Sequence, residues 1–294
     1  MPPARHFGRP AFVLVSVVLS VCFALFPAVI GAGASSRPEP AAGVAYLGFD
    51  TNSYPGDASV AGLRRTFSFI GYWLNDPPGG ASIPWAGKRK ILRGEGFGFL
   101  VLFNGRLERD LKTAQRAGVL GSGDARVAAN EAIREGFRPG TVIFLDQEEG
   151  GEMEPDQMAY VLAWIDGVVA ANFRAGVYCS GMPAAAGPGR LAVTAQNIRE
   201  RAGNRKVTFF VYNDACPPSQ GCVYRREAPP PAESGVRFAS VWQFAQSPRR
   251  KQFTASCAAT YDLDGNCHPP WGAGIGSIFL DLDSATSADP SDGR

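Results

Sequence analysis

Histidine is nearly absent from this chain of 294 residues, which contains only two. His6 lies in the N-terminal region, and His268 follows Cys267 in a stretch rich in proline and glycine. Protein zinc sites are built mainly from histidine and cysteine, so this scarcity argues against zinc chemistry. We therefore expect no metal and no cofactor.

An excess of charge of one sign is also lacking. The formal net charge is +2, and the short basic runs Lys88–Lys90 and Arg249–Lys251 stand outside any aromatic-rich patch. A nucleic-acid-binding surface normally combines a strong positive excess with a basic stripe or an aromatic platform. The composition therefore argues against a nucleic-acid partner.

The N-terminus has the pattern of an export signal. Arg5 and Arg9 precede an apolar stretch from Ala11 to Ile30, and Ala32 to Ala34 offer a small-residue cleavage site. We expect residues 1–34 to be a signal peptide, although the apolar stretch is long enough for an uncleaved membrane anchor. Residues 35–43 would form a linker. The protein would then be exported, either periplasmic or secreted, with membrane contact only through this segment.

Cysteine usage agrees with export, because exported proteins can hold disulfides. Two local pairings are compatible with the spacing, Cys216 with Cys222 and Cys257 with Cys267, but the sequence leaves the connectivity open. Cys179 follows an apolar run, and we expect it to be a buried free thiol.

Eight apolar, β-prone runs recur after the linker, and their starts lie roughly 23 to 44 residues apart. The runs are Val44–Asp50, Phe67–Leu74, Phe97–Asn104, Thr141–Glu148, Arg174–Ser180, Lys206–Asn213, Phe238–Phe244 and Ser277–Asp283. This spacing is typical of strand–helix units, and nearly continuous apolarity is typical of strands covered on both faces. We predict an α/β fold, a single-domain (β/α)8 TIM-type barrel over residues 44–286 with a C-terminal tail over 287–294. A doubly wound open sheet is the main rival.

Three helical regions can be read between the runs. Pro155 can occupy the first turn of a helix that continues to about Asn172. Thr194 is the expected N-cap of a helix that ends at Gly203. Residues 107–136 should hold one or two helices, broken near Gly121 to Gly123.

Two carboxylates end the fourth run, in the segment TVIFLDQE from Thr141 to Glu148. Side chains alternate along a strand, so Asp146 and Glu148 should point the same way. A buried strand that ends in two such acids resembles the carboxyl pair of a glycosidase. The alternative is that Asp146 caps the next helix and Glu148 belongs to a solvated acidic loop.

Acids, amides and aromatic residues also stand at or near the ends of the other runs. The predicted substrate-binding residues are Asp50, Asn104, Tyr178, Tyr212, Trp242, Gln243, Asp281 and Asp283. Aromatic faces stack on sugar rings, while acids and amides bind sugar hydroxyls. Each residue alone could be an ordinary core or turn residue, but the set is typical of a sugar-binding site.

Five short motifs resemble the glycoside hydrolase family 25 lysozymes and, more closely, the related bacterial glycoside-hydrolase-like domains of unknown function. They are GFD at Gly48–Asp50, FLDQE at Phe144–Glu148, AGVY at Ala175–Tyr178, WQF at Trp242–Phe244 and DLD at Asp281–Asp283. The resemblance implies a (β/α)8-type barrel that cleaves the β-1,4 bond after N-acetylmuramic acid in peptidoglycan.

By position, the resemblance makes Glu148 the catalytic acid and Asp146 the second acid of the D-x-E motif. Asp50 and Asp281 match active-site aspartates, whereas Phe244 replaces the tyrosine of the family's W-Q-Y segment. Some of the uncharacterised relatives lack the glutamate that is present here.

The sequence thus predicts an exported glycoside hydrolase that acts on a cell-wall polysaccharide, above all peptidoglycan. Glu148 would protonate the glycosidic oxygen, with its pKa raised by burial and by the charge of Asp146. Asp146 could act as a nucleophile or orient an N-acetyl group, while Asp50 and Asp281 would hold substrate hydroxyls.

Two other functions stay open. The barrel could be a non-catalytic glycan-binding or cell-envelope module. A metal-dependent hydrolase is the third reading, because Asp262–Asn266 (DLDGN) suggests calcium, but this stretch lacks the full loop pattern.

Overall fold

The computed structural model describes residues 44–79, 84–213, 227–245 and 280–294. All of them belong to one compact unit, residues 42–294. The predicted signal and linker lie outside the described residues, as do Asp262–Asn266 and the four cysteines expected to form disulfides, Cys216, Cys222, Cys257 and Cys267.

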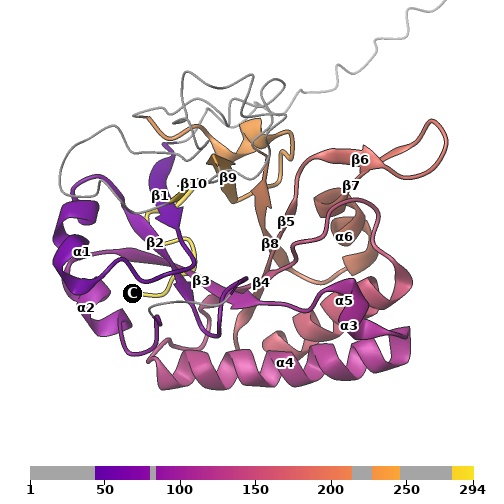
Figure 1. Ribbon diagram of the computed structural model, residues 1–294, viewed down its shortest axis with the longest axis horizontal. Coiled ribbons are helices and arrows are strands. Elements are labelled where there is room, and N and C mark those ends of the chain that lie inside the picture. Colours follow the sequence, from indigo (N-terminus) through magenta and orange to yellow (C-terminus); the bar gives the residue numbers. More distant parts are fainter. Residues whose placement is uncertain (1–43, 80–83, 214–226, 246–279) are drawn as a thin grey trace, which may run out of the picture. The chain divides into compact units, whose positions relative to one another are not determined.

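Eight strands form a closed barrel in the order β1-β10-β9-β8-β5-β4-β3-β2 (Figure 1). They are β1 (Tyr46–Asp50), β2 (Phe69–Trp73), β3 (Gly98–Asn104), β4 (Val142–Asp146), β5 (Arg174–Ser180), β8 (Val207–Tyr212), β9 (Val241–Ala245) and β10 (Asp281–Ala285). Each predicted run supplies one strand, which confirms the α/β barrel. We call the end at which the parallel strands finish the carboxyl end, and the opposite end the amino end.

The direction of the last strand departs from a simple βα repeat. β10 runs antiparallel to both neighbours, β1 and β9, whereas the other pairs in the barrel are parallel. Reading Asp281 and Asp283 as the finishing end of a parallel strand was therefore wrong. Asp281 still lies at the carboxyl end, because β10 starts there opposite Asp50.

Helices cover part of the barrel. They are α1 (Asp57–Arg64), α2 (Arg89–Gly94), α3 (Glu108–Leu111), α4 (Ala114–Arg134), α5 (Pro155–Ala170) and α6 (Thr194–Ala202), with a 3-10 turn at Pro231–Ser234. A small hairpin, β6 (Pro183–Ala185) and β7 (Leu191–Val193), precedes α6. No helix in these described parts of the chain is long and apolar enough to cross a membrane.

Helix α5 confirms the prediction from Pro155, but the expected break near Gly121 is wrong. Helix α4 continues through that position, packed against α5. A Cβ at Gly121 would lie 2.3 Å from the carbonyl oxygen of Tyr160, so this glycine permits close approach of the two helices. The interruption falls earlier, between α3 and α4.

Thr194 does not cap α6 as predicted, because Val193 holds the N-cap position. The Thr194 hydroxyl instead donates to the Gly151 carbonyl and accepts from the Gly151 amide, both at 2.8 Å. These bonds fasten the loop that follows β4 to the start of α6.

The barrel strands are buried on both faces, as their continuous apolarity predicted. Inner and outer aromatic contacts recur along the wall, for example Phe49 on Phe67 at 4.7 Å and Tyr178 on Phe210 at 4.6 Å between ring centroids. Cys179 is a buried free thiol, as expected from the sequence.

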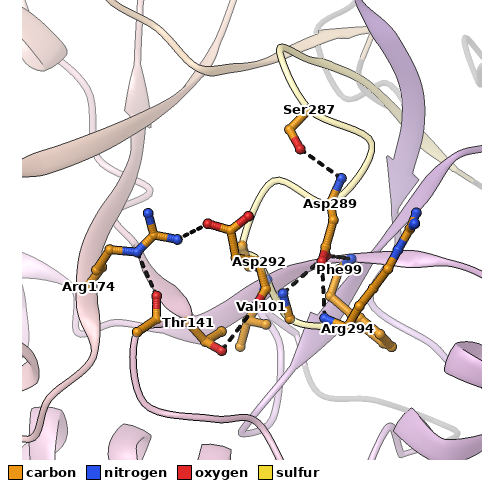
Figure 2. Close-up of polar contacts among 11 residues, drawn as sticks. Phe99, Val101, Thr141, Arg174, Ser287, Asp289, Asp292 and Arg294 are labelled. Atoms are coloured by element: carbon orange, nitrogen blue, oxygen red, sulfur yellow. Dashed lines mark hydrogen bonds and ion pairs between the residues drawn. The ribbon is translucent and has the colours of Figure 1, made fainter.

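The C-terminal tail fills the amino end between β3 and β4 (Figure 2). Ser291 accepts from the Val101 amide through its hydroxyl and from the Val142 amide through its carbonyl, both at 2.8 Å. The Asp289 carboxylate accepts from the Phe99 amide at 2.8 Å, and Asp292 forms an ion pair with Arg174. The predicted tail is therefore an integral part of the barrel.

Candidate functional site

Acidic side chains from three strands gather at the carboxyl end of the barrel. Asp50 ends β1 and pairs in register with Asp281, the first residue of β10. Asp146 ends β4 and pairs with Tyr178 of β5. Asp50 and Asp146 are 4% and 3% exposed, so both carboxyls face the packed interior rather than solvent.

Asp283 lies deeper, two residues along β10 from Asp281. It pairs in register with Gly48 of β1 and Gln243 of β9, and its exposed fraction is 0%. The D-L-D spacing places both aspartates on one face of the strand, as alternation requires.

A chain of two hydrogen bonds crosses the barrel interior. The Tyr178 hydroxyl donates to Gln243 Oε1 at 2.7 Å, and Gln243 Nε2 donates to Asp50 Oδ2 at 2.7 Å. Because β8 lies between β5 and β9, and β10 between β9 and β1, these bonds span strands that are not neighbours. With Oε1 engaged by Tyr178, the amide of Gln243 presents its donor to Asp50.

The environment raises the pKa of Asp50 from 3.8 to about 7. Burial is the main cause, and the charge of Glu148 adds to it. Hydrogen bonds from Gln243 and Asp283 act in the opposite direction, because they stabilise the carboxylate.

The pKa of Asp146 is raised well above its usual value, first by burial and then by the charges of Glu148 and Asp50. A hydrogen bond to the Glu148 carboxyl raises it further. No amide, guanidinium or hydroxyl group of the described residues donates to Asp146. The environment of Asp146 therefore favours its protonated form.

Asp283 interacts with Asp50 as Asp146 does with Glu148. Burial raises its pKa well above the usual value, and the charges of Asp50 and Asp281 and a hydrogen bond to Asp50 add to the effect. The site thus contains two carboxyl pairs, Asp146 with Glu148 and Asp283 with Asp50, and in each pair burial raises the pKa of an aspartate. Like charges placed so close favour sharing of a proton.

Glu148 is exposed, so the expectation that it is buried was wrong. It lies beyond the last residue of β4, while Asp146 stays inside the barrel. The neighbouring Glu149 fixes this loop, because it accepts from Gln157 Nε2 and from the Glu108 amide, both at 2.8 Å. The sequence alone suggested only a solvated acidic run here and did not single out Glu149.

Of the other predicted substrate-binding residues, Trp242 packs away from the acids, whereas Asn104 and Tyr212 end β3 and β8 at the same carboxyl end. Trp242 is fully buried and its indole donates to the Asn213 carbonyl at 3.0 Å, so its ring packs in the core instead of facing a sugar. Asn104 donates to the Asp76 carbonyl at 2.8 Å and thereby anchors a loop. Tyr212 lies against Tyr178, with ring centroids 5.5 Å apart.

The structure therefore brings together Asp50, Asp146, Glu148, Tyr178, Gln243 and Asp283, with Asp281 beside them. Burial raises the pKa of Tyr178 well above its usual value, so its hydroxyl remains a donor. Within the described ranges, no group of three or more histidine, cysteine, aspartate or glutamate side chains is arranged to hold a metal ion. The chemistry that this set offers is proton transfer between paired carboxyls.

No family model matches this sequence, and no curated protein matches it. Solved structures share its fold at low identity. An uncharacterised B. stearothermophilus protein is 17% identical with a TM-score of 0.50, over 82% of this chain and 95% of that one. The Tat-secreted protein Rv2525c of Mycobacterium tuberculosis is 14% identical with a TM-score of 0.48, over 83% and 95%.

The spore cortex lytic enzyme SleM of Clostridium perfringens is 11% identical with a TM-score of 0.49, over 85% of this chain and 70% of that one. Likeness at these identities concerns the fold. The first of the three supports the α/β barrel that the strand order defines.

Proposed function

We propose that this chain is an exported glycoside hydrolase that acts on a cell-wall polysaccharide, with peptidoglycan as the substrate. The observation that carries the proposal is the Asp146–Glu148 pair at the carboxyl end of the barrel. Asp146 is buried in surroundings that raise its pKa, while Glu148 is exposed where a substrate can reach it. Active sites of α/β barrels are built at this end.

In the proposed reaction, Glu148 passes the proton of the pair to the glycosidic oxygen. The bond between that oxygen and the anomeric carbon breaks, and water adds its oxygen to the anomeric carbon. The remaining proton of the water returns to the Asp146–Glu148 pair, which ends the cycle as it began. Asp146 acts in this scheme as the proton reservoir, because a buried neutral carboxyl is a poor nucleophile.

Asp50 supports the same chemistry from the end of β1. The charge of Glu148 raises the pKa of Asp50. Gln243, held by Tyr178, keeps the Asp50 carboxyl oriented. In this proposal Tyr178 and Gln243 position Asp50, and they do not bind sugar hydroxyls directly.

The substrate class rests on the sequence. Motifs around Asp50, Asp146 and Asp281 resemble those of lysozymes, and the N-terminal pattern of an export signal would deliver the protein to the envelope. Both features favour a wall polysaccharide over an intracellular glycan.

Glu148→Gln tests the proposal, with Glu152→Gln as the matched control. Glu152 is an exposed acid of the same loop, paired with Arg190 at the surface. Release of reducing ends from purified peptidoglycan should fall roughly 10²–10⁴-fold in Glu148→Gln, the usual contribution of a general acid. The control should retain activity, and co-sedimentation with peptidoglycan should persist in both variants.

Undiminished release by Glu148→Gln would refute the assignment of the acid. Binding to peptidoglycan without release of reducing ends by the wild type would instead favour a non-catalytic glycan-binding module on the same barrel.

A further inference from the structure

A hollow lies at the amino end of the barrel, away from the acids. Its volume is about 620 Å³, and the ends of α5 and α6 and the starts of β5 and β8 line it. Pockets of about 300–1,000 Å³ are the usual size for small-molecule sites. The acids at the carboxyl end contribute nothing to its wall.

The floor of this hollow is apolar. Phe173 and Phe209 are buried there beside the half-buried Val207. Phe238 packs edge-on against Phe209, with ring centroids 4.9 Å apart. An apolar organic group that lies on this floor would remove apolar surface from water, which favours binding.

The rim of the hollow is cationic. Arg174, Arg199, Arg205 and Lys206 line it, and no acidic residue does. Two of these cations are neutralised by acids outside the lining, Arg174 by Asp292 and Arg205 by Asp166. The side chains of Arg199 and Lys206 form neither an ion pair nor a hydrogen bond with any residue in the described ranges.

Cations near the C-terminal end of a helix often interact with its last carbonyl groups, but neither Arg199 nor Lys206 does so in α6. Arg205 serves that end, since its Nη1 donates to the Ala202 carbonyl at 3.3 Å. The guanidinium of Arg199 instead stacks on the Phe238 ring, 4.2 Å from its centroid. Such stacking fixes a guanidinium by its face and leaves its N–H edges available for an oxyanion.

We propose that this hollow binds a phosphate ester, with the phosphate between Arg199 and Lys206 and the organic part on the floor of Phe173 and Phe209. A phosphate offers several acceptor oxygens at once, and arginine pairs with it through two parallel hydrogen bonds. This site is separate from the proposed glycan site, and it does not depend on the hydrolase activity.

Calorimetric titration of the whole folded chain with phenyl phosphate tests the proposal. Benzyl alcohol, which carries no sugar, is the neutral probe and benzoate the carboxylate probe. We expect phenyl phosphate to bind and to weaken as salt is added, with the neutral probe silent and benzoate weaker. Arg199→Gln and Lys206→Gln should each lose about tenfold or more in affinity, because each removes a charge-assisted contact.

Arg201→Gln is the matched control, because Arg201 is an exposed arginine of the same helix outside the lining. It should bind like the wild type. Absence of binding to phenyl phosphate, equal binding of benzoate, or unchanged affinity in both Arg199→Gln and Lys206→Gln would each overturn the proposal. Circular dichroism of each variant verifies that the fold is kept.

Discussion

Replacing Asp50 by asparagine should stabilise the fold at alkaline pH while it removes a group of the proposed site. In the folded chain the pKa of Asp50 is about 7, against 3.8 for an unperturbed aspartate. Between these values the folded chain holds a proton that the unfolded chain has released. The stability of the wild type therefore falls as the pH rises through this window, by up to about 4 kcal/mol.

Asparagine carries no charge, so the variant escapes that loss. The substitution also removes the Asp50 charge, which raises the pKa values of Asp146 and Asp283 in the wild type. The difference in the free energy of unfolding between Asp50→Asn and the wild type should shift in favour of the variant from pH 4 to pH 8. Any constant cost of a poorer hydrogen bond with Gln243 cancels in this comparison.

Urea denaturation at several pH values measures the effect. Asp110→Asn, a change at an exposed acid of α3, serves as the control and should run parallel to the wild type. A pH-independent difference between Asp50→Asn and the wild type would refute the reasoning, because it would mean that Asp50 is ionised alike in the folded and unfolded chains.

Two further predictions concern the rest of the barrel. Ser291→Ala should lower the free energy of unfolding by about 1–3 kcal/mol, because the buried Val101 amide loses its acceptor. The control Ser287→Ala, at a partly exposed contact, should change it by less than about 0.5 kcal/mol. Equal urea midpoints for the two variants would contradict this prediction. Burial raises the pKa of the Cys179 thiol, so a thiol reagent at pH 8 should label it only at the rate at which the chain unfolds. Mass spectrometry identifies the labelled residue. Fast labelling of Cys179 in the folded chain would contradict its burial.

The eight strands could be predicted because each is a run of apolar residues long enough to be buried on both faces. The direction of β10 could not, since alternation in a run such as Ser277–Asp283 is the same whichever way the strand is read.

The acids of the site could be predicted from their places at strand ends, and the shared face of Asp281 and Asp283 from their spacing. The roles of Tyr178 and Gln243 could not, because their contact exists only once the barrel has closed. Trp242 was predicted to stack on a sugar ring. Neighbouring residues of a strand point to opposite faces, so Gln243 faces the barrel interior while Trp242 packs on the outer side. The exposure of Glu148 likewise depends on where β4 ends, which sequence patterns define only to within a few residues.

The contacts of the C-terminal residues with the barrel have a consequence for folding kinetics. Contacts that complete the barrel join residues very distant in sequence, such as Arg89 with Gly293 and Val101 with Ser291, separated by 204 and 190 positions. Such non-local closure is entropically slow, and it cannot occur until the last residues of the segment are available. A chain that emerges N-terminus first from a ribosome would therefore hold its strands unclosed until the C-terminal residues arrive.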